Sequence, residues 1–365
     1  MRRFARLARR GLFDTVVPVL NPGLKRATTG GPVGSGRDLA RLPKAEMHLH
    51  LVGAMREATL VELAAQAGLT APAPRVFTTF AEFEKIYQAA FAALQSRMEN
   101  LQRLVREVVA DAAADGVVWV QPQFNPHSFH RFGPPAEVLE QVLAEGYDAG
   151  ARYGVGFGIT IAAMRHRGPE AAEDLARFAA GWAGNGVHAF GLNGDEAAFA
   201  SEPFAKAFAI ARDAGLAAAP HAGELAGPES VRAAVDALGA SRIAHGIRAV
   251  EDPRLLDDLA QHHVTLDVCL TSNKALGIIP DTAMHPLLRL VAAGVRCTLG
   301  ADDPLMFGRG LLAEYRLAQT ALGLTDQQLA DLARTSIQTT TAPASLVTTA
   351  IDRIDNWLTA TPGGP

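Results

Sequence analysis

Cysteine is scarce in this chain of 365 residues, which has two, Cys269 and Cys297. Both stand in short apolar runs typical of buried strands, where a free cysteine behaves as a small hydrophobic residue. Two cysteines cannot supply the disulfide framework that is common in small secreted proteins. We therefore expect the protein to work in a reduced, cytoplasmic compartment.

Long apolar runs and a strong excess of charge are also lacking. No segment reaches the roughly 18 apolar residues that a membrane span requires. The net charge is −4, and the body of the chain shows no basic face that would bind nucleic acid. The composition, 48% hydrophobic and 20% charged, is that of a globular protein with a large core. A small-molecule substrate fits these features better than nucleic acid or a membrane.

Acidic residues are nearly absent from the first 26 positions, which hold seven Lys and Arg but one Asp. The apolar stretch 12–20 could be mistaken for an export signal, but Asp14 and Pro18 interrupt it and no small-residue cleavage site follows. A Gly-rich stretch comes next, at 28–36. We therefore predict a flexible, Arg-rich cytosolic extension over residues 1–38 and a single folded domain over residues 39–360.

Short β-rich runs then alternate with Ala/Leu/Glu-rich stretches of helical period. The strand candidates are 46–50, 117–123, 155–161, 188–192, 217–221, 242–245, 264–268 and 296–299. The helix candidates that follow them often open with Pro and close near Gly, and include 135–153, 169–183, 202–214, 228–238, 253–262 and 285–293. Eight such units predict an α/β fold, a closed (β/α)8 TIM barrel. Helical regions within 55–68 and 80–115 would lie over the barrel mouth.

Two histidines, His48 and His50, stand two residues apart at the end of the first predicted strand. Residues i and i+2 of a strand point to one face, so both imidazoles can aim at one point, as in half of a zinc site. Chance placement is the alternative for an isolated H-x-H among 11 histidines. His221, His245 and Asp302 also follow strand candidates. Because strand ends share one rim of a barrel, these residues together favour a single metal centre.

Histidine nitrogens and a carboxylate oxygen suit Zn²⁺, although Fe²⁺, Co²⁺ and Mn²⁺ are compatible too. A catalytic zinc lowers the pKa of its bound water from about 15.7 towards roughly 7 and so generates hydroxide. Glu224, three residues after His221, is placed to act as a general acid and base. Asp303 could bind a substrate N–H or a protonated ring nitrogen; an N-terminal helix cap is the structural alternative.

Five motifs together resemble the adenosine deaminase family of the amidohydrolase superfamily, and its actinobacterial members in particular. They are LPKAEMHLH at 42–50, LNGDE at 192–196, PHAGE at 220–224, DVCLTSN at 267–273 and DDPLMF at 302–307. The resemblance runs from about residue 42 to residue 358. It implies a zinc-dependent aminohydrolase that holds one Zn²⁺ per chain and acts on a small purine nucleoside.

The resemblance also implies a role for each site residue. The zinc ligands would be His48, His50, His221 and Asp302. Glu224 would protonate purine N1, and His245 would orient the zinc-bound hydroxide that attacks C6. Asp303 would accept a hydrogen bond from N7, while the backbone N–H of Gly194 would contact N3. Ammonia would then leave, so that adenosine or 2′-deoxyadenosine would be converted to the inosine product.

Some positions depart from the family pattern. Many members carry an aspartate for the ribose 5′-hydroxyl where this chain has Val52. Gln121 and Gln123 stand where Glu and Arg are usual, and Gly191 stands where Asp is common. A 5′-modified adenosine such as aminodeoxyfutalosine, or free adenine, therefore stays open as the substrate.

Two alternatives of another class are also open. The same barrel and metal chemistry could hydrolyse an amide or a phosphoester, or the chain could be a non-catalytic metal-binding or signalling homologue. Glu224 and Asp303 suit a ring nitrogen better than a leaving alkoxide, and the complete ligand set argues against loss of activity. No P-C-x-x-C motif occurs, which excludes the architecture of cytidine-type deaminases.

Overall fold

The computed structural model of the protein describes residues 36–71 and 80–361. Most of the predicted N-terminal extension lies outside these residues. Its last part, residues 36–38, packs on the C-terminal helix α15 (Ala344–Thr359). The guanidinium of Arg37 donates hydrogen bonds to the backbone carbonyls of Trp357 at 2.9 Å and Leu358 at 2.6 Å. Arg37 therefore contributes to the folded body.

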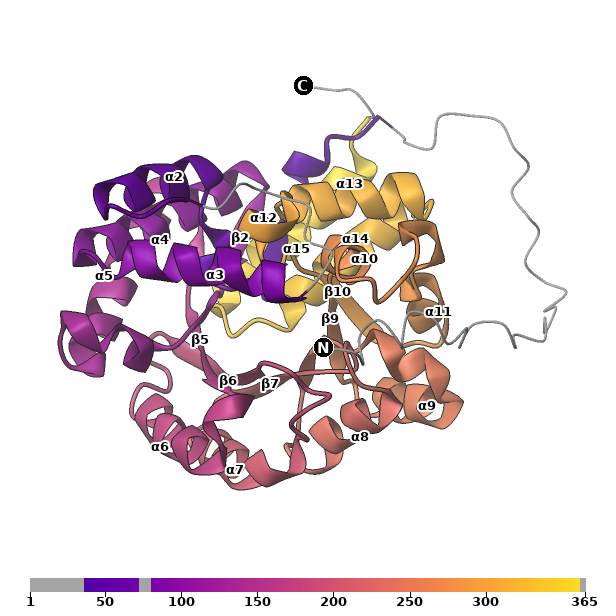
Figure 1. Ribbon diagram of the computed structural model, residues 1–365. Helices are drawn as coiled ribbons and strands as arrows, with labels where there is room; N and C mark the ends of the chain where they lie inside the picture. The colour runs from indigo at the N-terminus through magenta and orange to yellow at the C-terminus, as the bar shows by residue number, and fades with distance from the viewer. Residues whose placement is uncertain (1–35, 72–79, 362–365) are drawn as a thin grey trace, which may run out of the picture.

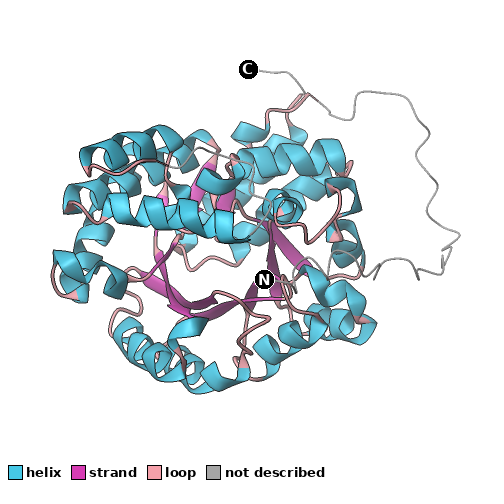
Figure 2. Ribbon diagram, in the orientation of Figure 1, coloured by secondary structure: helices cyan, strands magenta, loops and turns pink. Residues whose placement is uncertain are grey.

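Parallel strands form a ring that helices surround (Figures 1 and 2). The strands are β1 (Lys44–Glu46), β2 (Val117–Val120), β3 (Gln123–Phe124), β4 (Gly156–Phe157), β5 (Ile159–Met164), β6 (Val187–Asn193), β7 (Ala217–Ala222), β8 (Arg242–His245), β9 (Thr265–Val268) and β10 (Arg296–Leu299). They form two hydrogen-bonded groups, β1-β2-β4 and β10-β9-β8-β7-β6-β5-β3. Isolated bridges from Leu49 to Asp302 and from His50 to Gln123 join the groups and close the ring. The predicted TIM barrel is confirmed.

Two of the predicted strands are interrupted. The second breaks between β2 and β3 at Pro122, which has no N–H to donate to a neighbouring strand. The third breaks between β4 and β5 at Gly158, where an added Cβ would lie 2.4 Å from the ring of His188.

The first strand also differs from its prediction over 46–50, because β1 ends at Glu46. Beyond it the chain bonds to the last barrel strand through Asp302. Asp302 N–H donates to the His48 carbonyl, and His50 N–H donates to the Asp302 carbonyl, both at 2.9 Å. Two predicted metal ligands are therefore tied directly to a third by the backbone.

The helices around the ring follow the predicted alternation. They are α5 (Pro135–Tyr153), α6 (Pro169–Ala180), α7 (Ala205–Asp213), α8 (Pro228–Asp236), α9 (Pro253–Gln261), α10 (Leu270–Ala275), α11 (Leu287–Ala292), α12 (Pro304–Phe307), α13 (Leu311–Ala321), α14 (Asp326–Gln338) and α15. The bounds of α5 coincide with the predicted ones, and Gly154 ends this helix with a φ of 72°. None of the described helices is both long and apolar enough to span a membrane.

The insert after the first strand contains α2 (Glu57–Gln66), α3 (Phe80–Leu94) and α4 (Met98–Ala114). Helix α3 crosses in front of the strands in Figure 1. It contacts α12 and the short 3-10 helix η2 (Val52–Ala54), and Phe83 stacks on Phe307 with ring centroids 6.0 Å apart. Helix α3 therefore covers the segments that carry Val52 and Asp303, as predicted, whereas α4 packs mainly on α5 and β2.

Candidate metal centre

The candidate ligands converge on the carboxylate of Asp302, which follows β10. Its Oδ1 lies 3.3 Å from Nε2 of His50 and 3.7 Å from Nε2 of His48. His221, in β7, belongs to the same cluster as His48 and His50, because one ring nitrogen from each of the three histidines lies within 4.8 Å of the others. His245, at the end of β8, places its Nε2 3.9 Å from Oδ2 of Asp302.

The backbone is unusual at two of these positions. His245 has a φ of 66° and Asp302 a φ of 61°, in the left-handed region that residues other than glycine rarely adopt. Such conformations cost free energy and cluster at functional sites. Here each lies at or just after a strand end, and the two side chains face each other.

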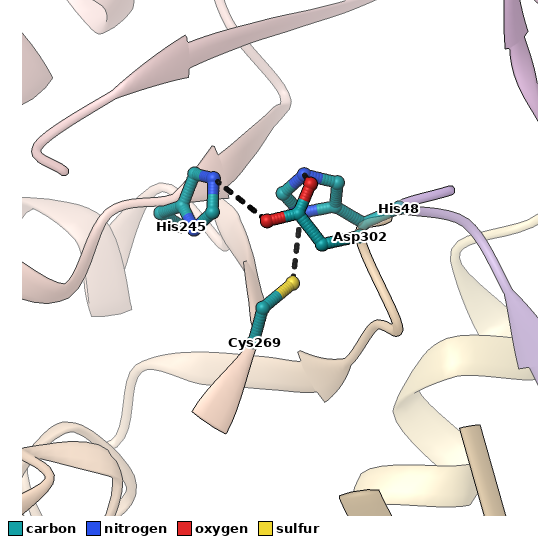
Figure 3. Close-up of side chains that lie close together, drawn as sticks. All are labelled: His48, His245, Cys269 and Asp302. Atoms are coloured by element: carbon teal, nitrogen blue, oxygen red, sulfur yellow. Dashed lines mark hydrogen bonds and ion pairs between the residues drawn. The ribbon is translucent and has the colours of Figure 1, made fainter. Parts of the chain in front are cut away.

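Cys269 lies unexpectedly close to this cluster (Figure 3). A ligand atom of Cys269 lies within 4.8 Å of ligand atoms of His48, His245 and Asp302. Its Sγ, however, faces Nδ1 of His48, at 3.3 Å, and that nitrogen also lies 3.0 Å from the carbonyl of Asp267. A nitrogen facing a carbonyl must carry the proton, so the lone pair of His48 is on Nε2. Cys269 therefore borders the ring on the side away from the available lone pair.

Asn193 faces Nδ1 of His50, as the carbonyl of Asp267 faces Nδ1 of His48, although the sequence alone predicted no role for Asn193. Its amide lies 3.4 Å from Nδ1 of His50, while its Oδ1 is buried without a hydrogen-bond partner. The two ends of an amide are assigned by their hydrogen bonds, and with Oδ1 towards the ring the amide accepts the Nδ1 proton. Nε2 of His50 is then free to bind a metal, an arrangement typical of metal-binding histidines.

The electrostatics of the cluster favour a cation. Burial alone would lower the pKa of His50, but the neighbouring acidic side chains, including the hydrogen-bonded Asp302 carboxylate, raise it to about 9. Burial also opposes ionisation of Asp302, yet the hydrogen bond to His50 and the nearby imidazoles hold its pKa well below the usual range. These shifts favour positive charge at His50, while burial lowers the pKa of His48 and His221 and keeps both imidazoles neutral, as metal binding requires. The buried Nε2 of His48 has no hydrogen-bond partner, as expected of a ligand position.

Two further carboxylates face the cluster. Glu224, after β7, places Oε2 3.4 Å from Nε2 of His245, and its Oε1 is buried without a partner. Asp303 also has a buried, unpartnered Oδ1, and a Cβ at Gly53 would lie 1.6 Å from that oxygen. Burial raises the pKa of both carboxyl groups well above their usual range, and the Asp302 carboxylate adds to the effect. Each can therefore hold a proton that a substrate could receive or share.

The two remaining predicted residues, Gly194 and Val52, directly follow segments that contribute to the cluster. Gly194 directly follows Asn193 and has a φ of 103°, which few other residues tolerate. Val52 is buried in η2, beside Gly53. The structure thus gathers the metal and proton-transfer candidates in one place and puts Gly194 and Val52 on adjoining loops.

Comparison with known proteins identifies the family of this chain. A family model described as adenosine deaminase matches residues 43–357. The chain belongs to the adenosine deaminase family. A "putative adenosine/adenine deaminase" of Streptomyces coelicolor is 43% identical, over 89% of this chain and 99% of that protein. An "aminodeoxyfutalosine deaminase" of Acidothermus cellulolyticus is 35% identical, over 80% and 85%.

The solved structures agree. An adenine deaminase of Arthrobacter aurescens superposes with a TM-score of 0.79 at 26% identity, covering 87% of this chain and 99% of that one. The protein is therefore a metal-dependent deaminase with the amidohydrolase barrel. The comparisons name more than one purine substrate, so they leave the substrate of this member open.

The structure also reveals supporting residues of the deaminase that sequence analysis missed. Glu196, in the loop after β6, accepts hydrogen bonds from the backbone N–H groups of Gly223 at 2.8 Å and Glu224 at 2.6 Å. Arg165, after β5, donates to the carbonyl of His221 at 2.7 Å. Both residues are charged and buried, and that combination is the main indication that they support the site. Their hydrogen-bond partners are backbone groups on another loop.

Proposed function

We propose that this deaminase replaces the 6-amino group of a purine nucleoside by oxygen, with adenosine or 2′-deoxyadenosine as the first candidates. The observation that carries the proposal is the pair of carboxyl groups beside the cluster, Glu224 and Asp303. Each has an oxygen without a partner, and burial of such an atom is costly unless a ligand completes it. Two ring nitrogens of a purine can complete both.

We propose His48, His50, His221 and Asp302 as the ligands of one Zn²⁺, because imidazole nitrogens with one carboxylate suit this ion. When bound, the ion supplies Lewis acidity, which lowers the pKa of a coordinated water towards neutrality. The chain's own residues do the rest.

Glu224 transfers a proton to N1 and so makes C6 more electrophilic. His245 lies between Glu224 and Asp302 and stabilises the attacking oxygen by hydrogen bonding. N7 of a purine nucleoside carries no proton, so Asp303, whose pKa is raised, donates to it. This reverses the direction of the hydrogen bond expected from the sequence.

A 5′-modified adenosine is the second candidate. Val52 is apolar and buried, and it stands where the family resemblance places the 5′ end of the sugar. The similarity to an aminodeoxyfutalosine deaminase supports this alternative, and the similarity to an adenine deaminase keeps free adenine as a third.

A substrate panel tests the proposal. Zinc-loaded protein is mixed with adenosine, 2′-deoxyadenosine, 5′-deoxyadenosine, aminodeoxyfutalosine and adenine, and the loss of adenine absorbance and the release of ammonia are followed. Turnover of at least one compound, abolished by a chelator and restored by zinc, is the expected result. Turnover of an amide or phosphoester panel without any ammonia release from purines would overturn it.

A further inference from the structure

A chain of three buried side chains leads away from the active site, from His245 through Asn273 to His285. Asn273 is in α10, and His285 lies just before α11. The amide Nδ2 of Asn273 lies 3.2 Å from Nδ1 of His245, and its Oδ1 lies 3.1 Å from Nε2 of His285. None of the three side chains is more than 4% exposed.

The direction of each hydrogen bond between these three side chains follows from the contacts of His285. The backbone N–H of Leu287 donates to Nδ1 of His285 at 3.1 Å, and a backbone amide can only donate. Nδ1 of His285 is therefore bare. Burial lowers the pKa of His285 to about 3, so the ring is neutral and its one proton is on Nε2. That proton is donated to Oδ1 of Asn273.

The amide of Asn273 in turn determines which ring nitrogen of His245 carries the proton. With Oδ1 occupied by His285, its Nδ2 faces His245 and donates to Nδ1, which must also be bare. The proton of His245 is then on Nε2, the nitrogen that faces Glu224 and Asp302.

We infer that His285, acting through Asn273, is a positioning residue that fixes His245 in the Nε2–H tautomer. The inference deepens the proposed deamination, because an N–H donor, and not a lone pair, then faces the reacting oxygen. It also removes His245 from the possible metal ligands, although His245 lies in the cluster of Figure 3. The opposite tautomer would present a fifth lone pair to the ion and no donor to the substrate.

The tautomer can be measured directly. In zinc-loaded protein with ¹⁵N-labelled histidine, two-dimensional NMR that correlates the ring nitrogens with the ring protons shows which nitrogen carries hydrogen. The signal of His245 is assigned by its absence in His245→Asn. We expect a proton on Nε2 and a bare Nδ1. Because this measurement needs no substrate, it stands even if the protein deaminates none of the purines tested. A proton on Nδ1 in the unmodified protein overturns the inference.

Asn273→Asp is the sharpest variant, since it keeps the shape but replaces the donor towards His245 by an acceptor. The proton of His245 should move to Nδ1, and kcat should fall about 100-fold or more with little change in KM. An unchanged tautomer in this variant contradicts the relay.

His285 itself is tested with a pair of variants. His285→Phe removes the donor to Asn273 and should lower kcat about 10- to 100-fold, the usual effect of losing an outer hydrogen-bond partner. His285→Gln can still donate to Asn273 and should recover a large part of that loss together with the Nε2–H signal. Equal losses in the two variants would overturn the role of His285. The exposed His262, replaced by Phe, controls for loss of a histidine as such.

Discussion

The carboxylate of Glu196 accepts the backbone N–H of Glu224 at 2.6 Å, so the proposed proton donor is held by a residue of the neighbouring loop. The same carboxylate accepts the N–H groups of Gly223 and Ala226, each at 2.8 Å, and the hydroxyl of Ser230 at 2.7 Å. All of these donors lie within residues 223–230. They fix the backbone of the loop after β7, which would otherwise have unpaired N–H groups.

Replacing Glu196 by Gln should therefore weaken both catalysis and stability. The amide nitrogen of Gln would face N–H donors, and the loop would shift. We expect kcat to fall about 10- to 100-fold and the free energy of unfolding to drop by about 1–3 kcal/mol. Steady-state kinetics and urea unfolding measure the two effects. Asp195→Asn is the matched control, because Asp195 bonds within its own loop, to Ala197 and Ala198. Equal effects in the two variants would show that Glu196 does not hold the loop.

Glu224→Gln separates proton transfer from metal binding. The variant keeps the shape of the side chain but cannot shuttle a proton, so kcat should fall by roughly 10²–10⁴-fold. Its zinc content should equal that of the unmodified protein, because Glu224 is not among the proposed ligands. Stopped assays with metal analysis of the same sample check both points. Near-normal turnover would remove Glu224 from the mechanism.

Metal content distinguishes the proposed ligands from Cys269, which also contacts His48. Replacing His50 or Asp302 by Ala should remove bound zinc, whereas Cys269→Ser should retain one zinc per chain, because Sγ borders the Nδ1 side of His48. Inductively coupled plasma mass spectrometry of dialysed protein gives the stoichiometry. Loss of zinc from Cys269→Ser, with retention in Asp302→Ala, would reverse the ligand assignment.

Much of this site is local in the sequence, which is why it could be predicted. His221, His245 and Asp302 lie at or just after the ends of strands, and the repeated βα pattern alone puts strand ends on one rim. The pattern also gave the bounds of α5. The first strand was predicted too long because its hydrogen bonds beyond Glu46 go to Asp302, and no local pattern contains that pairing.

The supporting residues could not be predicted, for a related reason. Glu196 and Asn273 bond to partners that become neighbours only when the barrel closes. Asn193 stands inside a motif noted for its glycine, and nothing in the sequence indicates that its amide meets His50, 143 positions away. Such contacts depend on loop conformation, which the periodicity of strands and helices does not encode.

The carboxyl group of Glu314 predicts a pH dependence of stability. Glu314, in α13, accepts the backbone N–H groups of Leu270 at 2.7 Å and Thr271 at 3.2 Å. Burial raises its pKa from 4.5 to about 7, although these hydrogen bonds oppose the shift. The unfolded chain thus releases this proton before the folded protein does. The contribution of Glu314 to stability is complete below pH 4.5 and is lost as the pH rises through 7.

That loss amounts to about 3 kcal/mol, at 1.36 kcal/mol for each pKa unit. Glu314→Gln cannot ionise, so its stability should fall less than that of the unmodified protein between pH 5 and pH 8, by about 2–3 kcal/mol. Urea unfolding at both pH values measures the difference, with the exposed Glu137→Gln as control. Parallel pH profiles for Glu314→Gln and the unmodified protein would contradict the assignment.

The proposed place of Val52 at the 5′ end of the sugar predicts the tolerance of the enzyme at that position of its substrate. An aspartate at this rim position would reward a free 5′-hydroxyl with a charge-assisted hydrogen bond, of about 1.5–3 kcal/mol when well formed. Valine offers no polar atom. A substrate with hydrogen or an apolar group on C5′ therefore loses little here, whereas a site built with Asp would leave a carboxylate unpaired and reject it.

We expect kcat/KM for 5′-deoxyadenosine to be close to that for adenosine in the unmodified enzyme. Val52→Asp should shift the ratio towards adenosine by about 10- to 100-fold, the equivalent of that hydrogen bond. Val52→Leu, which adds no polar atom, is the control, and zinc content shows that both variants keep the metal centre. If adenosine already leads by about 100-fold without substitution, another group holds the 5′-hydroxyl, because a difference of that size requires a well-formed polar contact.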